Sequence, residues 1–197
     1  MARTTFGIVL FDDVEELDFV GPWEVFGSVP KAGHETSVAS VAQSGGAVRC
    51  ANGLQVVADY GFDDAPPFDV VLVPGGMGTR TEVDNPVLIE WLRGAARRCD
   101  WVTSVCTGSL LLHGAGLTKG RRITTHWAFV DTLRATAKDA QVLDDVRFID
   151  DGNVVTAAGV SAGIDMALWL VGQIWDAETA RNTQRIIQYE PEPPYAS

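Results

Sequence analysis

The chain has 197 residues, of which 46% are hydrophobic and 21% are charged, and its formal net charge is -11 at pH 7. This length and composition predict one globular domain, residues 1–197, with enough apolar residues for a sizeable core. The excess of carboxylates disfavours nucleic-acid or membrane partners, because phosphate backbones and lipid surfaces are also negatively charged. The N-terminus turns acidic too early for a signal peptide, and no apolar run approaches the ~20 residues that span a bilayer. We therefore expect a cytoplasmic protein.

Short β-branched runs alternate with longer amphipathic segments, which is typical of an α/β fold with a mostly parallel sheet. Strands are predicted at residues 5–11, 35–41, 54–58, 69–73, 101–105, 122–125, 146–149 and 153–157. Asp151-Gly152 between the last two strands indicates a hairpin. Helices are predicted after the first strand, with Pro22 in the first turn, and then over 86–98, 108–115, from about 128, 162–175 and 177–189.

The three cysteines, Cys50, Cys99 and Cys106, are odd in number and have no CxxC spacing. This pattern predicts neither a disulfide framework nor a structural zinc site, and we expect no metal and no cofactor. Cys106 is distinctive because it lies between the predicted strand WVTSV and a helix. Such a corner points a thiol outward at the carboxyl edge of the sheet, and the helix N-terminus lowers its pKa. A nucleophilic thiolate is one interpretation of Cys106, and a small buried hydrophobic residue is the other.

Two further segments reach the same edge of the sheet. Gly75 and Gly76 end the strand at 69–73 and allow close backbone approach with N–H groups free to donate, although they also fit a plain turn. Asp18 follows the first strand at the start of a helix, where it fits a helix N-cap. If burial raises its pKa, Asp18 can also act as a general acid and base toward Cys106.

Five motifs occur in one order along the chain: LD-x-x-GP at 17–22, PGG-x-G at 74–78, SVCTGS at 104–109, GRR-x-TTHW at 120–127 and AGID-x-AL at 162–168. Together they resemble the DJ-1/PfpI superfamily, and specifically its isocyanide hydratase branch. The resemblance implies a flavodoxin-like sandwich (class I glutamine amidotransferase-like) with helices on both faces and a nucleophile elbow. It also implies a homodimer with the active site close to the subunit interface.

The resemblance assigns roles to individual residues. Cys106 matches the nucleophilic cysteine, Asp18 the aspartate of the hydratase branch and Thr107 the threonine beside the nucleophile. Gly75 and Gly76 match a backbone-amide pocket that faces the sulfur. Peptidase-like members have histidine where this chain has Thr107, which argues against a Cys-His protease. His126 follows another strand, where it either approaches the cleft or caps the next helix.

These residues predict a hydratase that adds water to a small-molecule substrate, an isocyanide, and releases an N-substituted formamide. In this hypothesis the Cys106 thiolate attacks the terminal carbon, protonated Asp18 supplies a proton, and water then hydrolyses the thioimidate with help from Asp18 and Thr107. One alternative is a glyoxalase- or deglycase-like enzyme, although those relatives tend to use glutamate as the acid. Another alternative is a redox or ligand sensor without catalytic activity, because an exposed thiolate of low pKa is easily oxidised.

Overall fold

The computed structural model describes residues 3–192 and 194, and its centre is a seven-stranded sheet. The strand order is β10-β11-β7-β6-β1-β2-β5, and all neighbours are parallel except the β10–β11 pair. The strands of this sheet are β1 Thr4–Val9, β2 Thr36–Ala42, β5 Tyr60–Gly61, β6 Val70–Val73, β7 Trp101–Val105, β10 Phe148–Asp151 and β11 Val154–Ala157. The predicted α/β class and mostly parallel sheet are confirmed.

Two predicted strands lie outside the main sheet. Residues 54–58 contain β4 (Gln55–Val57), which pairs with β3 (Ala47–Arg49), and residues 122–125 contain β8 (Arg122–Ile123), which pairs with β9 (Gln141–Val142). β4 exposes two of its three side chains, whereas the strands at the centre of the main sheet are buried. The predicted hairpin is correct: β10 and β11 pair antiparallel around Gly152, whose φ is 69°.

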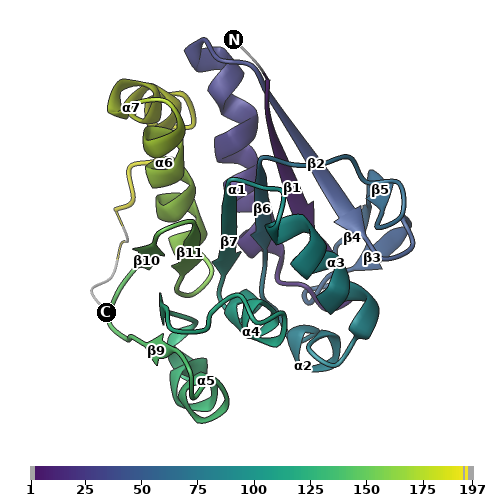
Figure 1. Cartoon of the computed structure of the whole chain (residues 1–197). Coiled ribbons are helices and arrows are strands. Elements are labelled where there is room, and N and C mark those ends of the chain that lie inside the picture. The colour runs from purple at the N-terminus through teal and green to yellow at the C-terminus, as the bar shows by residue number, and fades with distance from the viewer. Residues whose placement is uncertain (1–2, 193, 195–197) are drawn as a thin grey trace.

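The helices cover both faces of the sheet (Figure 1). On one face α1 packs against α6 and α6 against α7, whereas α3 and α4 pack together on the other. The helical segments are α1 Glu16–Ser28, η1 Val29–Ala32, α2 Thr79–Glu82, α3 Pro86–Ala96, α4 Gly108–Gly114, η2 Trp127–Phe129, α5 Val130–Thr136, α6 Ala162–Ile174 and α7 Ala177–Ile186.

The prediction that Pro22 lies in the first turn of its helix is wrong. Helix α1 already begins at Glu16, so Pro22 lies in its interior. The acidic residues at the start of α1 favour a helix N-terminus there. Pro22 only removes the N–H that would donate to the carbonyl group of Asp18.

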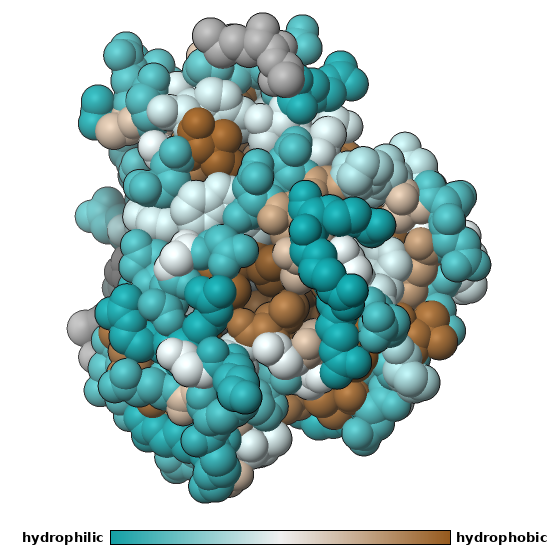
Figure 2. Space-filling model, viewed as in Figure 1, coloured by the Kyte–Doolittle hydropathy of each residue, from teal (hydrophilic) through white to brown (hydrophobic). Residues whose placement is uncertain are grey.

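A small lobe follows α4 and has a core of its own. It combines β8, η2, α5 and β9, and Figure 1 shows α5 and β9 beyond the ends of the central strands. Its core joins Leu110 of α4 to six buried side chains of the lobe itself: Ile123, Phe129, Val130, Leu133, Ala137 and Val142. Figure 2 shows this side of the molecule, with hydrophobic residues gathered in a central hollow and hydrophilic residues over most of the remaining surface.

Candidate active site

Cys106 occupies a strained corner between β7 and α4. Its φ is 55°, which is rare for a residue with a side chain. The Cys106 N–H donates to the carbonyl groups of Ala157 (3.1 Å) and Ala158 (2.8 Å), while its own carbonyl accepts from the Thr125 hydroxyl at 2.9 Å. These bonds join the corner to β11 and to the small lobe. The backbone therefore holds the sulfur in one place.

The two glycines after β6 allow the surrounding backbone to close around this corner. A Cβ at Gly75 would lie 2.5 Å from the Thr107 nitrogen and 2.8 Å from Cys106 Cβ. Gly76 has a φ of 119°, and a Cβ there would lie 2.3 Å from the Asp13 carbonyl oxygen. Both positions therefore require glycine.

The prediction that these two amides are free to face the sulfur is wrong. The Gly75 N–H donates to Asp18 Oδ2 at 2.8 Å, and the Gly76 N–H donates to Thr107 Oγ1 at 3.1 Å. The N–H groups that act on the sulfur belong to Thr107 and Val160, and both lower the pKa of the thiol. The two glycines instead position the side chains of Asp18 and Thr107.

Asp18 is completely buried in the first turn of α1. Glu15 holds the N-cap position, so the N-cap interpretation of Asp18 does not apply. The Asp18 Oδ2 atom accepts the Gly75 N–H. Among the described residues, the Asp18 Oδ1 atom has no hydrogen-bond partner. A buried carboxyl oxygen without a donor strongly disfavours ionisation.

Asp18 and Cys106 each change the pKa of the other. Burial raises the pKa of the Asp18 carboxyl to about 7, and the interaction with the Cys106 thiol acts against this rise. Burial, and then the charge of Asp18, raise the pKa of the Cys106 thiol to about 12. The expectation of a lowered thiol pKa is therefore wrong, because burial and the charge of Asp18 outweigh the hydrogen bonds from Thr107 and Val160. Between these two values the pair holds one proton.

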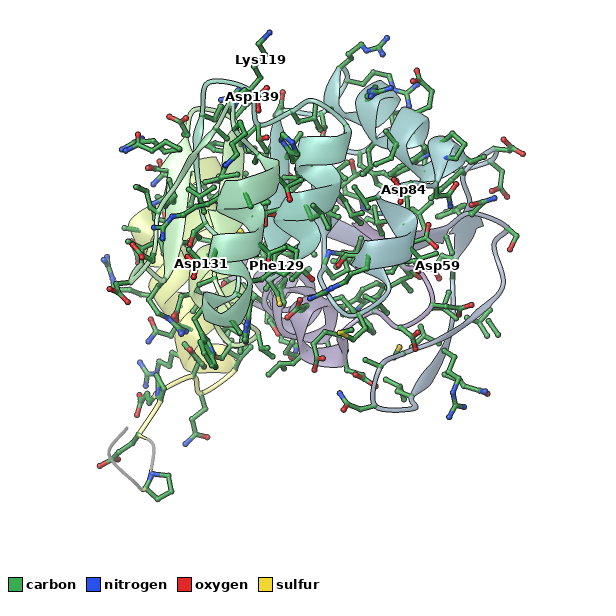
Figure 3. The ribbon with its side chains drawn as sticks, turned by 90° about the horizontal axis from the view of Figure 1, so that it is seen from below. Asp59, Asp84, Lys119, Phe129, Asp131 and Asp139 are labelled. Carbon is green, nitrogen blue, oxygen red and sulfur yellow. The ribbon has the colours of Figure 1, made fainter. Side chains whose placement is uncertain are left out.

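The Cys106 side chain, 7% of which is exposed, lines a surface cavity of about 180 Å³. The cavity walls come from the residue before α1, the loop after β6, α2, the corner, the small lobe and the loop after β11, and they include Glu15, Met77, Arg80, His126 and Phe129. Figure 3 views the molecule from below and shows Phe129 near the middle of this end. A cavity of this size admits a small reactive group.

A second cavity, of about 690 Å³, adjoins the first and shares His126 and Val160 with it. It is lined by the small lobe and by the loops before β10 and after β11, and Trp127 forms part of its wall. Trp127 is 81% exposed, which is unusual for so large an apolar side chain. The two cavities together can hold a substrate that is larger than its reacting group.

His126 has both of the positions considered for it. It caps η2 by accepting the Ala128 N–H at Nδ1, at a distance of 3.2 Å, and its ring lines both cavities. Gly159 lies against this ring, since a Cβ there would be 2.4 Å from His126 Cδ2. The hydrogen bond from the Ala128 N–H to His126 Nδ1 therefore has a structural role, the capping of η2.

The other two cysteines have no such surroundings. Cys50 and Cys99 are both buried, and burial is the largest cause of the raised pKa of each thiol. Within residues 3–192 and 194, His, Cys, Asp and Glu side chains form no group of three that could hold a metal ion. In the same part of the chain, every helix is too short or too polar to cross a bilayer.

The sequence reasoning missed Arg80 and Val160, which line the same cavity as Cys106. Arg80 lies in α2, a one-turn helix after the paired glycines, and its Nη1 atom donates to Thr107 Oγ1 at 3.2 Å. Val160 follows β11, the strand beside β7, and its φ is 39°. Neighbouring parallel strands end at one edge of the sheet, so the loop after the strand at 153–157 offered a signal for Val160.

Comparison with known proteins places these features in context. A model described as the DJ-1/PfpI family matches residues 6–173. Isonitrile hydratase of Pseudomonas putida is 39% identical over 97% of this chain and 81% of that protein. The Parkinson disease protein 7 homolog of Danio rerio is 30% identical over 88% of this chain and 90% of that protein. The crystal structure of a THiJ/PfpI family protein from Pseudomonas syringae has a TM-score of 0.90 and 31% identity, and covers 99% of this chain and 78% of that chain.

Proposed function

This chain belongs to the DJ-1/PfpI family, and we propose that it is an enzyme that hydrates isocyanides (isonitriles), R–NC, to N-substituted formamides. The observation that carries the proposal is the buried Asp18 carboxyl beside the Cys106 thiol: Asp18 Oδ2 accepts the Gly75 N–H at 2.8 Å, and burial raises the pKa of this carboxyl. Thr107, and not a histidine, follows the cysteine, so the carboxyl group is the proton carrier beside the sulfur. The 39% identity to a protein named isonitrile hydratase supports the same substrate class.

The first step forms a carbon–sulfur bond. Above pH 7 the proton resides on sulfur and Asp18 is ionised, because the thiol has the higher pKa. Asp18 takes the thiol proton as Cys106 Sγ attacks the terminal carbon of the isocyanide, and then gives that proton to the same carbon. The product of this step is the thioimidate R–N=CH–S–Cys106. The mechanism expected from the sequence began instead with a Cys106 thiolate and a protonated Asp18. Both starting states of the pair hold one proton in total.

The second step consumes water. Asp18, ionised again, takes a proton from water while the oxygen adds to the thioimidate carbon, and it passes that proton to the substrate nitrogen. The carbon–sulfur bond then breaks, and the hydroxyl proton moves through Asp18 to the departing sulfur. The formamide R–NH–CHO leaves, and the thiol and carboxylate are restored. One carboxyl group therefore serves as base and acid in turn.

The two cavities suggest how the substrate lies. The isocyanide carbon and nitrogen occupy the 180 Å³ cavity beside Cys106, where the Thr107 and Val160 amides stabilise negative charge on sulfur. The substituent R extends past His126 and Val160 into the 690 Å³ cavity. The exposed Trp127 in its wall favours an aromatic substituent, which stacks on the indole ring.

Formamide absorbance measured with purified protein and an aryl isocyanide tests the proposed reaction. Turnover that is lost in Cys106→Ala supports the covalent route, and undiminished turnover in that variant contradicts it. Methylglyoxal, assayed in parallel, tests the glyoxalase-like alternative. Turnover of methylglyoxal without turnover of any isocyanide would reassign the substrate class.

The sensor alternative depended on an exposed thiolate of low pKa. Cys106 is buried and its pKa is raised, so the structure gives no support to easy oxidation. Mass spectrometry after mild peroxide treatment tests this directly. Selective and reversible oxidation of Cys106 would restore the sensor hypothesis.

We also propose that the chain forms a homodimer through α1. Leu17 and Val20 are exposed on α1, on either side of the buried Asp18, and lie with Ile164 and Tyr189 around an apolar surface groove. Covering these side chains with a second copy would remove apolar area from water close to the active site. Light scattering of the wild type and of Leu17→Asp tests this, since the aspartate should yield monomers.

A further inference from the structure

The Arg80 side chain is a cation without a carboxylate partner in the wall of the Cys106 cavity. Acidic residues are in excess in this chain, which has 26 Asp and Glu residues and 15 Lys and Arg residues. Even so, no carboxylate among the described residues lies within ion-pair distance of the Arg80 guanidinium. Arg80 is also exposed, so a ligand that enters the cavity can reach it.

Three oxygen atoms and an aromatic ring hold this guanidinium in one place. Its Nη1 atom donates to the Gly76 carbonyl at 2.7 Å. The same Nη1 atom lies 3.1 Å from Thr79 Oγ1 and 3.2 Å from Thr107 Oγ1. The central carbon of the guanidinium lies 4.6 Å from the centre of the Phe129 ring, in a cation–π contact with the small lobe. A side chain that is already fixed in place loses little conformational entropy when it binds a ligand.

The rest of the guanidinium has unused donors. All three hydrogen-bond contacts are made by Nη1, and the N–H groups of Nε and Nη2 have no acceptor within residues 3–192 and 194. Nε and Nη2 present their N–H groups in a fixed fork, whose geometry matches the two oxygens of a carboxylate. Thr107, which Nη1 contacts, directly follows Cys106, so this fork lies near the reacting sulfur.

Glu15 lines the same cavity but does not neutralise Arg80. Its Oε1 atom accepts from Asn52 Nδ2, in the loop between β3 and β4, at a distance of 3.2 Å. Glu15 makes no ion pair with Arg80. An anionic ligand would therefore give Arg80 the partner that the cavity walls do not supply.

We propose that Arg80 binds a carboxylate of the substrate, and that the substrate class is the 2-isocyano carboxylates. This assignment rests on the proposed function and narrows its substrate. Because the cavity beside Cys106 has a volume of only about 180 Å³, the isocyano and carboxylate groups must lie close together, as they do when one carbon atom carries both. A further substituent of that carbon atom extends past His126 into the 690 Å³ cavity, toward Trp127.

The test measures ligand binding beside Cys106 without any turnover. Iodoacetamide, which is uncharged, alkylates the Cys106 sulfur with loss of iodide, and a ligand in the cavity slows this reaction. The ligands are N-formylglycine, the product expected from isocyanoacetate, and N-formylglycinamide, in which an uncharged amide replaces the carboxylate. Mass spectrometry of the Cys106 peptide gives the concentration of each ligand that halves the alkylation rate.

The wild-type protein should bind N-formylglycine about tenfold more tightly than N-formylglycinamide at pH 8, as expected for charge-assisted hydrogen bonds. Arg80→Met should remove this preference, and Arg80→Lys should keep a smaller one, since lysine retains the charge but not the fork. Arg97→Met is the matched control and should keep the full preference, because Arg97 is an exposed arginine after α3, outside the cavity.

The half-rate concentration does not depend on how fast each variant is alkylated without ligand. A purely structural effect of Arg80 on the sulfur would therefore leave the preference for the carboxylate unchanged. Thermal melts show whether each variant is folded. If Arg80→Met does not fold, Arg80→Lys and the comparison of the two ligands in the wild type decide the outcome.

Two results would overturn the assignment. The first is equal binding of the two ligands by the wild-type protein, and the second is an undiminished preference in Arg80→Met. Because no isocyanide is used, this outcome is separate from that of the hydration assay. A preference that depends on Arg80 stands even if no isocyanide is hydrated, whereas hydration of neutral isocyanides without that preference removes only the narrower substrate class.

Discussion

The two walls of the Cys106 cavity are built differently. One wall is the corner after β7 with Asp18 beneath it, where the groups are buried, strained and fixed by backbone hydrogen bonds. The other wall is the small lobe, which has a core of only seven buried side chains and presents the exposed Trp127. From this contrast we expect the first wall to carry out the reaction and the second wall to recognise the substrate. Changes to the first wall should reduce the rate for every substrate, whereas changes to the second should alter which substrates are preferred.

The largest effect is expected from Cys106→Ser. A serine hydroxyl is a far weaker nucleophile than a thiol, so kcat/KM for every isocyanide should fall by about 10⁴-fold or more. The formamide absorbance assay measures the loss. Cys50→Ser is the matched control and should retain turnover, because Cys50 is buried outside the cavity.

Asp18→Asn should have the next largest effect. The amide can still accept the Gly75 N–H, but it cannot carry protons, so kcat should fall by about 10²- to 10⁴-fold for alkyl and aryl isocyanides alike. Single-turnover kinetics measure the fall. A fall in kcat for only the alkyl or only the aryl isocyanides would show that the wall with Asp18 also determines which substrates are preferred.

The pH dependence follows from the raised pKa of Asp18. Below about pH 7 the carboxyl is protonated and cannot take the thiol proton, so kcat/KM should fall about tenfold per pH unit on the acid side. Rates should form a plateau above pH 8, because the thiol titrates only near 12. A profile that rises around pH 4 instead would show that Asp18 ionises as an ordinary exposed acid.

Trp127→Ala should have the smallest effect and a selective one. Loss of the indole face should lower kcat/KM for an aryl isocyanide by about fivefold and leave a small alkyl isocyanide within about twofold, since stacking is worth roughly 1 kcal/mol. Parallel assays with the two substrates measure the ratio. Equal losses for both would show that the small lobe supports the chemistry and not the choice of substrate.

Much of this architecture could be predicted from the sequence. The apolar run WVTSV places Cys106 after a buried strand, and the paired glycines after 69–73 mark the neighbouring strand end. Local pattern could not show that the Gly75 amide is used by Asp18, 57 residues earlier in the chain. Nor could it show that burial and the charge of Asp18 raise the pKa of the Cys106 thiol, because desolvation depends on the packing of distant segments. Arg80 was missed for the same reason, since only the fold brings α2 beside the corner.

The most direct test of the central claim is a rapid-quench mass spectrum of the Cys106 peptide during a single turnover with an aryl isocyanide. Covalent catalysis by the Asp18–Cys106 pair predicts a peptide heavier by the mass of the intact isocyanide, which forms first and decays as formamide accumulates. Formamide production at an undiminished rate while Cys106 stays unmodified throughout would contradict it.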